Sequence, residues 1–87
     1  MRVGVKLFAT LAECVPEHIR RQTVDWRAGR AFAWDLPEGS TLTDLIDALA
    51  LPCEDVKQVF VNGRAQPFDH ILKDGDQVGI FPPIGGG

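Results

Sequence analysis

The chain has 87 residues, of which 45% are hydrophobic and 24% are charged, and its formal net charge is -3. This length fits one compact domain, because a second hydrophobic core would leave too few residues to bury either one, and the apolar content excludes a disordered chain. The acidic balance argues against binding to nucleic acid, since that role needs lysine and arginine to neutralise phosphates.

Strands are predicted wherever apolar residues recur at every second position. The first strand shows this best, because Val3, Val5 and Leu7 alternate with smaller or polar residues. Turn-forming sequences lie at 37–39, 62–63 and 74–76 and separate the later strands from their neighbours. In chain order, the predicted strands cover residues 3–8, 32–36, 56–61 and 77–81.

Two helical stretches are predicted between these strands. The first covers residues 9–15 and is disturbed by Pro16. The second covers residues 42–49, where apolar residues recur at i, i+3, i+4 and i+7. Ser40 or Thr41 can cap this second helix, and Pro52 prevents its continuation.

This order of elements predicts an α+β fold of the β-grasp type, with a mixed sheet of four to five strands packed on one main helix. We expect the β-grasp domain to span residues 1–83 and a flexible glycine tail to follow at 84–87. Residues 16–31 have no assigned place in this fold and are predicted to form an inserted hairpin or a loop.

Alternation also predicts that Phe8, Phe60 and Phe81 point away from the helix-covered face of the sheet. An exposed aromatic patch commonly binds a partner. The alternative is that residues 16–31 fold over this face and bury part of it. For Phe60 the two interpretations are balanced, whereas for Phe81, beside the tail, docking is favoured.

The C-terminal residues suggest a segment that enters another protein. Pro82 and Pro83 fix an extended path, Ile84 offers one apolar anchor, and the glycines 85–87 have no side chains, so a narrow slot could admit them. Glycine ends alone are weak evidence, because flexible termini are common. Here, however, the glycines follow directly on a strand, a rigid spacer and an aromatic patch.

The sequence also resembles a known family, through Asp69-His70, Leu72, the turn at 74–76, Val78 and the C-terminal run Phe81-Pro82-Pro83-Ile84-Gly85-Gly86-Gly87. These residues are similar to the MoaD/ThiS family of ubiquitin-like sulfur carriers, and the Phe-Pro-Pro element is most similar to its MoaD-like branch, the small subunits of molybdopterin synthase. The resemblance is looser over residues 5–13 and 41–49, and it does not include residues 16–31.

The resemblance implies a carrier that is not itself an enzyme. A ubiquitin-activating-type enzyme would adenylate Gly87 and convert its carboxylate to a thiocarboxylate, using ATP and a sulfur donor, with no cofactor bound to the carrier. A larger catalytic subunit would receive the tail through Gly85 and Gly86. Phe8 and Phe81 match positions of the hydrophobic contact surface, whereas Ala65 stands where a larger apolar contact residue can occur.

Several alternatives remain open from sequence alone. The sulfur acceptor could belong to thiamine synthesis or to transfer-RNA thiolation, Gly87 could instead be joined to lysines as in a protein modifier, or the tail could be inert. The arginines and Trp26 of residues 17–31 could contact an acidic partner or simply cover the core.

We expect no catalytic or metal-binding residue, because His18 and His70 lack a partner at nucleophile-base spacing. Cys14 and Cys53 lie outside any C-x-x-C pair, so we expect both to be small residues in or near the core. Glu13 interrupts an apolar stretch already too short for a signal peptide, and no longer apolar run follows. We therefore expect a cytoplasmic protein that does not bind a membrane.

Overall fold

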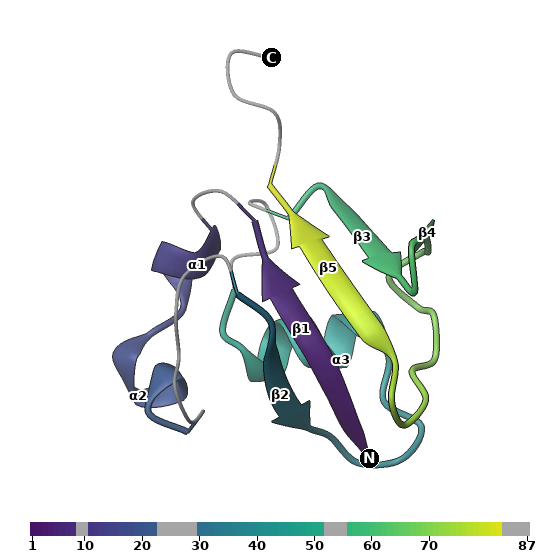
Figure 1. The fold of residues 1–87 in the computed structure, drawn as a ribbon, viewed down its shortest axis with the longest axis horizontal. Helices are drawn as coiled ribbons and strands as arrows, with labels where there is room; N and C mark the ends of the chain where they lie inside the picture. Colours follow the sequence, from purple (N-terminus) through teal and green to yellow (C-terminus); the bar gives the residue numbers. More distant parts are fainter. Residues whose placement is uncertain (9–10, 23–29, 52–55, 83–87) are drawn as a thin grey trace.

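The computed structural model describes residues 1–8, 11–22, 30–51 and 56–82 of the chain. Within these ranges, five strands and three helices surround one hydrophobic core (Figure 1). In chain order they are β1 (Arg2–Leu7), α1 (Leu11–Cys14), α2 (Glu17–Arg20), β2 (Phe32–Asp35), α3 (Leu42–Ala48), β3 (Gln58–Val61), β4 (Arg64–Ala65) and β5 (Gln77–Phe81).

The strands form one mixed sheet in the order β2-β1-β5-β3-β4. The central pair, β1 and β5, is parallel, and the other neighbouring pairs are antiparallel. Because β1 and β5 run in the same direction, both end at the edge of the sheet opposite the N-terminus (Figure 1). Burial alternates along both strands, which confirms the period of two predicted from sequence.

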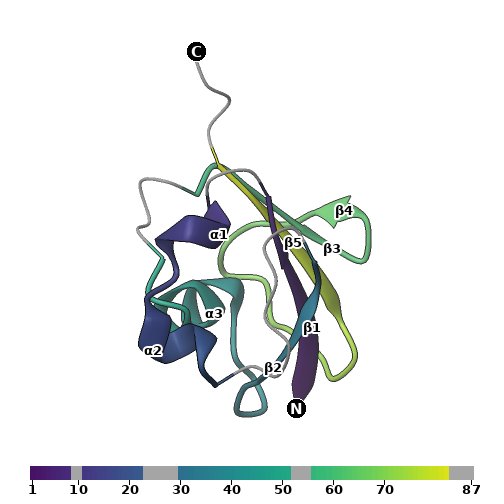
Figure 2. The same ribbon diagram turned by 60° about the vertical axis from the view of Figure 1, so that its left-hand side comes forward.

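All three helices lie on one side of the sheet (Figure 2). Each contributes apolar side chains to the core, including Leu11 from α1, Ile19 from α2 and Leu45 from α3, and these pack against the buried side of the strands. Among the described residues, the helical layer is therefore made of three short helices instead of the one main helix predicted, and α3, with seven residues, is the longest. Among the described residues, no helix covers the opposite face of the sheet.

The start of α3 has the predicted cap. The Thr41 hydroxyl accepts a hydrogen bond from the Asp44 amide at 3.3 Å, and the Asp44 carboxylate accepts one from the Thr41 amide at 2.9 Å. This reciprocal pair is a capping box, which satisfies amides that the helix itself leaves free. Ser40, the other candidate cap, is buried and donates its hydroxyl hydrogen to the carbonyl of Pro37.

The end of α3 comes before the residue expected to stop it. Ala50 adopts a positive φ of 56°, its amide donates to the Asp47 carbonyl, and the Leu51 amide donates to the Ile46 carbonyl. These two bonds form a Schellman motif, which closes the last turn of a helix. Pro52 lies outside the described residues, and the helix has already ended at Ala48, four residues earlier.

The turn at Asn62 and Gly63 connects β3 to β4, a two-residue strand that the sequence did not predict. Both turn residues have positive φ, 53° and 84° respectively. Such a pair is typical of the two-residue turn that matches the twist of a hairpin. The hairpin places Ala65 directly opposite Phe60.

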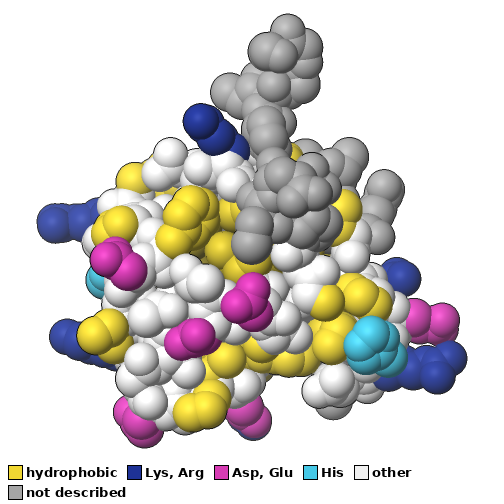
Figure 3. All heavy atoms as spheres, turned by 180° about the vertical axis from the view of Figure 1, so that it is seen from behind, with side chains coloured by type: hydrophobic (Ala, Val, Ile, Leu, Met, Phe, Trp, Pro, Cys, Tyr) yellow, Lys and Arg dark blue, Asp and Glu magenta, His cyan; other side chains and the backbone are white. Residues whose placement is uncertain are grey.

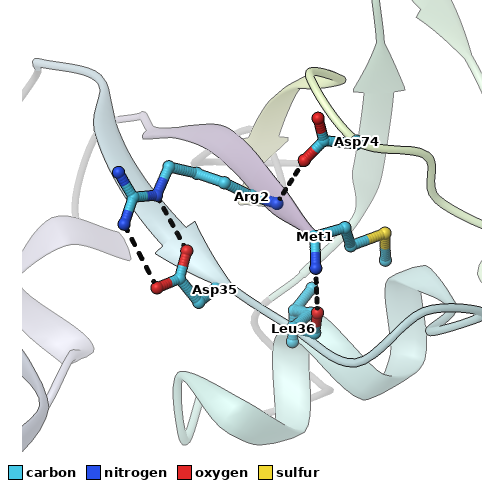
Figure 4. Close-up of polar contacts among 5 residues, drawn as sticks. All are labelled: Met1, Arg2, Asp35, Leu36 and Asp74. Atoms are coloured by element: carbon cyan, nitrogen blue, oxygen red, sulfur yellow. Dashed lines mark hydrogen bonds and ion pairs between the residues drawn. The ribbon is translucent and has the colours of Figure 1, made fainter.

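The first two residues are tied to the strands and turns on either side (Figure 4). The Met1 ammonium donates to the Leu36 carbonyl at 2.8 Å, and the Arg2 amide donates to the Asp74 carboxylate at 2.7 Å. The Arg2 guanidinium also forms two hydrogen bonds with the Asp35 carboxylate, at 2.8 and 3.3 Å. These contacts fix the end of β1 that lies farthest from the point where β5 ends.

The segment predicted to be a hairpin or a loop, residues 16–31, contains a short helix in its described part. Pro16 has an extended conformation and begins α2, since its carbonyl accepts hydrogen bonds from the amides of Ile19 and Arg20. Burial of Ile19 in the core holds this short helix on the helical side of the sheet. The remainder of the predicted hairpin or loop at 23–29, which includes Trp26, lies outside the described residues.

Other sequence predictions differ only at the ends of elements. The third strand begins at Gln58 instead of Val56, although Val56 is buried, and Cys14 is half-buried against the core, as expected. Cys53, the predicted domain end at residue 83 and the tail at 84–87 lie outside the described residues. None of the helices in the described ranges has the length and apolar character needed to cross a membrane.

Candidate docking site

Three phenylalanines meet on the face of the sheet that carries no described helix. Phe8 follows β1, Phe60 lies in β3 and Phe81 ends β5; we call them the aromatic cluster. Their strand neighbours, such as Leu7 and Ile80, are buried on the other face, so alternation turns the phenylalanines outward. The amide of Phe8 donates to the Ile80 carbonyl at 3.0 Å, which holds Phe8 in line with the sheet.

The rings of the cluster are in direct contact. Phe8 and Phe81 stack with their centroids 4.0 Å apart and an angle of 8° between their planes, and the Phe60 ring meets Phe81 edge-on at 5.4 Å. The Lys6 ammonium lies 5.0 Å from the centroid of Phe8, a favourable distance for a cation and an aromatic face. All three phenylalanines are only half-buried, so the cluster is an ordered surface that remains accessible.

A hollow of about 380 Å³ lies beside the cluster. Its floor is formed partly by Gly4 and Gly79, which bring no side chains, and its walls include all three phenylalanines. Lys6 is the only charged side chain among the described residues that line it. An apolar hollow with one cation at its wall is suited to a protein surface of matching shape and charge.

Gly79 determines how closely the stacked rings approach the sheet. A Cβ atom at this position would lie 3.3 Å from the Phe8 ring and 3.5 Å from the Phe81 ring. The first distance is tighter than ordinary packing, so even alanine would require the Phe8 ring to shift slightly. The absence of a side chain at Gly79 therefore helps the stacked pair to lie low against the strands.

Phe81 and Pro82 mark the point where the chain leaves the sheet. The carbonyl of Phe81 accepts a hydrogen bond from the Lys57 amide at 2.9 Å, and Pro82 is half-buried. The structure thus brings four predicted docking residues, Phe8, Phe60, Phe81 and Pro82, to one end of one face. The remaining predicted site residues, Pro83, Ile84, Gly85, Gly86 and Gly87, lie outside the described residues.

Sequence reasoning missed two residues of this site. Neither Lys6 nor Gly79 is among the predicted site residues, yet Lys6 contacts the Phe8 ring and Gly79 lies beneath the stack. Their position in the alternating pattern places them on the outward face, and this signal could have singled them out. Ala65 is exposed opposite Phe60. The large apolar side chain of this cross-strand pair is therefore that of Phe60, and Ala65 contributes only a methyl group.

A second, smaller hollow of about 130 Å³ lies between Thr43, Ile46, Val56 and Phe68. The helical side of the molecule, viewed in Figure 3, shows hydrophobic side chains interspersed with acidic ones. Neither Phe68 nor Ile71, both exposed, has an aromatic or cationic contact like those of the aromatic cluster among the described interactions. The larger hollow beside the cluster is therefore the better-defined site.

The ionisable groups that the fold perturbs lie outside the aromatic cluster. Hydrogen bonds from the Arg2 guanidinium, together with its charge, hold the pKa of the Asp35 carboxyl below its ordinary value. The same hydrogen bonds raise the pKa of Arg2. In the part of the chain that the structure describes, no group of three or more histidine, cysteine, aspartate or glutamate side chains could hold a metal ion.

The chain is similar over almost its full length to the molybdopterin synthase sulfur carrier subunit of Escherichia coli (strain K12). The two are 50% identical over 86 residues, which cover 98% of this chain and 99% of that protein. The chain is also 36% identical over 59 residues to protein RnfH of Paraburkholderia xenovorans (strain LB400); this match covers 61% of the chain but only 54% of RnfH.

A solved structure from Pyrococcus furiosus, described as a molybdopterin converting factor, subunit 1, has a TM-score of 0.64 and 30% identity, covering 97% of this chain and 99% of that one. Together with the sheet order, this likeness confirms the predicted ubiquitin-like β-grasp fold. The ThiS family model matches residues 5–87, and the chain therefore belongs to the ThiS family.

Proposed function

We propose that this chain is a sulfur carrier protein of molybdopterin biosynthesis and that Gly87 is the residue that carries the sulfur. The main support is the 50% identity, over nearly the whole of both chains, to the sulfur carrier subunit of Escherichia coli molybdopterin synthase. The aromatic cluster adds independent support, because a carrier needs an ordered surface on which a partner can hold it while the terminus reacts.

The proposed chemistry takes place at the terminal carboxylate. A carboxylate oxygen attacks the α-phosphorus of ATP, pyrophosphate leaves, and an acyl adenylate forms. Hydrosulfide supplied by a sulfur donor then attacks the acyl carbon, AMP leaves, the S–H proton is released, and a thiocarboxylate remains. Transfer of that sulfur to a pterin precursor, followed by addition of water at the acyl carbon, restores the carboxylate for another cycle.

Partner proteins perform each catalytic step in this scheme. The sequence contains neither the G-x-x-x-x-G-K-[ST] nor the G-x-G-x-x-G pattern that binds nucleotide phosphates, so we assign ATP to an adenylating enzyme of the ubiquitin-activating type. A larger catalytic subunit, as in molybdopterin synthase, holds the pterin. The carrier itself binds no cofactor in this scheme, and we place it in the cytoplasm, where ATP is available to the adenylating partner.

In this scheme the aromatic cluster binds the partner, and the C-terminal residues carry the terminal carboxylate into it. Phe8, Phe60 and Phe81 hold the partner at the base of the tail, and Pro82 and Pro83 direct the chain outward. Ile84 supplies one apolar contact inside the partner. Gly85 and Gly86 let the partner's backbone approach closely, because they have no side chain to exclude it.

The experiment is intact-protein mass spectrometry after incubation with the cognate adenylating enzyme, ATP and a sulfur donor. We expect the mass increase of one oxygen replaced by one sulfur, located at Gly87 by fragmentation. A variant with one extra residue after Gly87 is the matched control and should show no exchange, while its thermal unfolding stays unchanged. A wild-type protein that gains no sulfur, or that instead becomes joined to lysine side chains of other proteins, would contradict the proposal.

A further inference from the structure

The hollow beside the aromatic cluster has a feature that the proposed function does not use. Gly79 lies at the centre of the open face of the sheet, with Lys6 as its register partner on β1 and Phe60 as its partner on β3. Two large side chains thus flank a position that has none. The Phe8 and Phe81 rings cover Gly79 itself, so we call the open part of the hollow beside Gly79, lined by Lys6, Phe60 and Phe81, the socket.

We propose that the socket accepts one apolar side chain of the partner and that Lys6 pairs with a carboxylate next to that side chain on the same partner. Lys6 and Gly79 would then determine which proteins can dock. This inference rests on the proposed function, because the partner is the protein that receives the carrier's tail.

The shape and chemistry of the walls favour an apolar occupant. Phe8, Phe60 and Phe81 line the hollow, and Gly79, which has no side chain, lies beneath the Phe8 and Phe81 rings and lets them form a low wall beside the socket. The aromatic side chains are half-buried before any partner binds. Covering them with an apolar group removes water from their exposed faces, which is the principal gain on forming such a contact.

The charge on Lys6 requires a second feature of the partner. Lys6 is exposed, and its ammonium lies against the Phe8 ring. An apolar surface that covered this ammonium would strip its water without replacement, which is costly for a charged group. A carboxylate placed beside the apolar side chain removes this cost and orients the partner. A hydrophobic partner without such an acid should therefore be rejected.

Binding to the cognate large catalytic subunit, measured by titration calorimetry, tests both residues. We expect Lys6→Glu to weaken binding by about tenfold or more, because it places like charges together. Lys73→Glu is the matched control, since Lys73 is also exposed and changes the net charge equally but does not line the hollow. That control should bind within about twofold of the wild type.

Changing the shape of the socket tests the apolar part of the proposal. We expect Gly79→Val to weaken binding by about tenfold or more, because its side chain would displace the Phe8 and Phe81 rings that form the wall of the socket. Ala33→Val adds the same two methyl groups, without the Cβ atom, to an exposed site on β2 that does not line this hollow, and should leave binding unchanged. Thermal unfolding of each variant separates a loss of docking from a loss of folding.

Cross-linking of the unmodified proteins gives a measurement that does not depend on any variant. A water-soluble carbodiimide joins an amine to a carboxylate in direct contact, with loss of water. We expect mass spectrometry to find an amide bond between Lys6 and an aspartate or glutamate of the large subunit, and none at Lys73. An amide bond at Gly87 would report the tail instead and is distinguished by its sequence position.

The outcomes separate this inference from the proposed function. If wild-type protein gains sulfur and binds the large subunit, but Lys6→Glu and Gly79→Val bind as tightly and no cross-link forms at Lys6, the socket inference is wrong and the carrier function stands. If the wild type neither gains sulfur nor binds, the proposed function fails and the inference fails with it.

Discussion

Phe8 and Phe81 stack almost face to face, with ring centroids 4.0 Å apart, although they come from opposite ends of the chain. The parallel pairing of β1 with β5 is responsible, because it brings the last residues of both strands to the same edge of the sheet. The proposed docking surface is thus a product of strand topology. Its rings lie close to the chain's exit from the sheet at Pro82, where a partner could hold the domain while it handles the terminus.

Phe81 is the central ring of the cluster, so its removal should affect docking more than folding. We expect Phe81→Ala to slow adenylation at limiting partner concentration by about tenfold or more, because both of its ring contacts and its exposed surface are lost. The loss in unfolding free energy should be about 2 kcal/mol, since the side chain is only half-buried. Pyrophosphate release and thermal unfolding measure the two effects.

Phe68→Ala provides the control for that substitution. Phe68 is 43% exposed and lines the smaller hollow near α3, away from the aromatic cluster. It should leave the rate of adenylation unchanged. An equal loss of rate in both variants would indicate that general destabilisation, and not the cluster, limits the reaction.

The sheet and α3 could be predicted because each of their apolar patterns repeats over enough residues to show its period. Val3, Val5 and Leu7 repeat a period of two over a full strand, and the apolar residues of α3 repeat the helical period over two turns. The outward direction of Phe8 and Phe81 follows from the same alternation. These predictions needed only local pattern and the rule that apolar faces meet in one core.

Shorter features escaped prediction because their signals are too short or depend on distant residues. The strand β4 has two residues and α2 has four, so neither shows a period. The end of α3 is set by Ala50 in a left-handed conformation, for which alanine gives no warning. The contact between Lys6 and the Phe8 ring depends on side-chain geometry that only the folded chain provides.

Ala50 offers a direct test of that helix end. Its φ of 56° is unfavourable for a residue with a Cβ atom, and the residue is exposed. We expect Ala50→Gly to raise the unfolding free energy by about 0.5 to 1 kcal/mol, because relief of strain exceeds the added freedom of the unfolded chain. Chemical denaturation measures this change.

Ala48→Gly is the opposite control, because Ala48 lies within α3 in ordinary helical geometry and packs against the core. That variant should lose about 1 kcal/mol or more. Equal destabilisation at both positions would show that the left-handed conformation of Ala50 carries no strain.

The capping box of α3 predicts a loss of stability without a loss of core packing. Thr41→Ala removes the hydroxyl that accepts from the Asp44 amide, so the unfolding free energy should fall by about 1 kcal/mol. Thr41→Ser keeps the hydroxyl and should retain most of this stability. Docking should be unchanged in both variants, because Thr41 does not line the hollow beside the aromatic cluster. Denaturant unfolding measures both variants, and equal unfolding free energies for Thr41→Ala and Thr41→Ser would contradict the role of the cap.

The ion pair between Arg2 and Asp35 predicts how stability depends on pH. Hydrogen bonds from Arg2 lower the pKa of Asp35 in the folded protein, relative to its ordinary value of 3.8. The unfolded chain therefore binds a proton more readily, and the contribution of this carboxylate is fully present above pH 3.8 and disappears as pH falls through the lower, folded-state pKa.

We accordingly expect wild-type protein to be more stable than Asp35→Asn at neutral pH, with a gap that narrows below pH 3.8 as the wild-type carboxyl becomes neutral. Because both side chains are exposed, 69% for Arg2 and 70% for Asp35, the gap should be small and should shrink in high salt. Asp47→Asn is the control, since Asp47 is exposed and forms no ion pair among the described residues. Thermal unfolding of the three proteins between pH 2 and pH 7 measures the gap, and a gap that stays constant across this range would mean that protonation of Asp35 is not its cause.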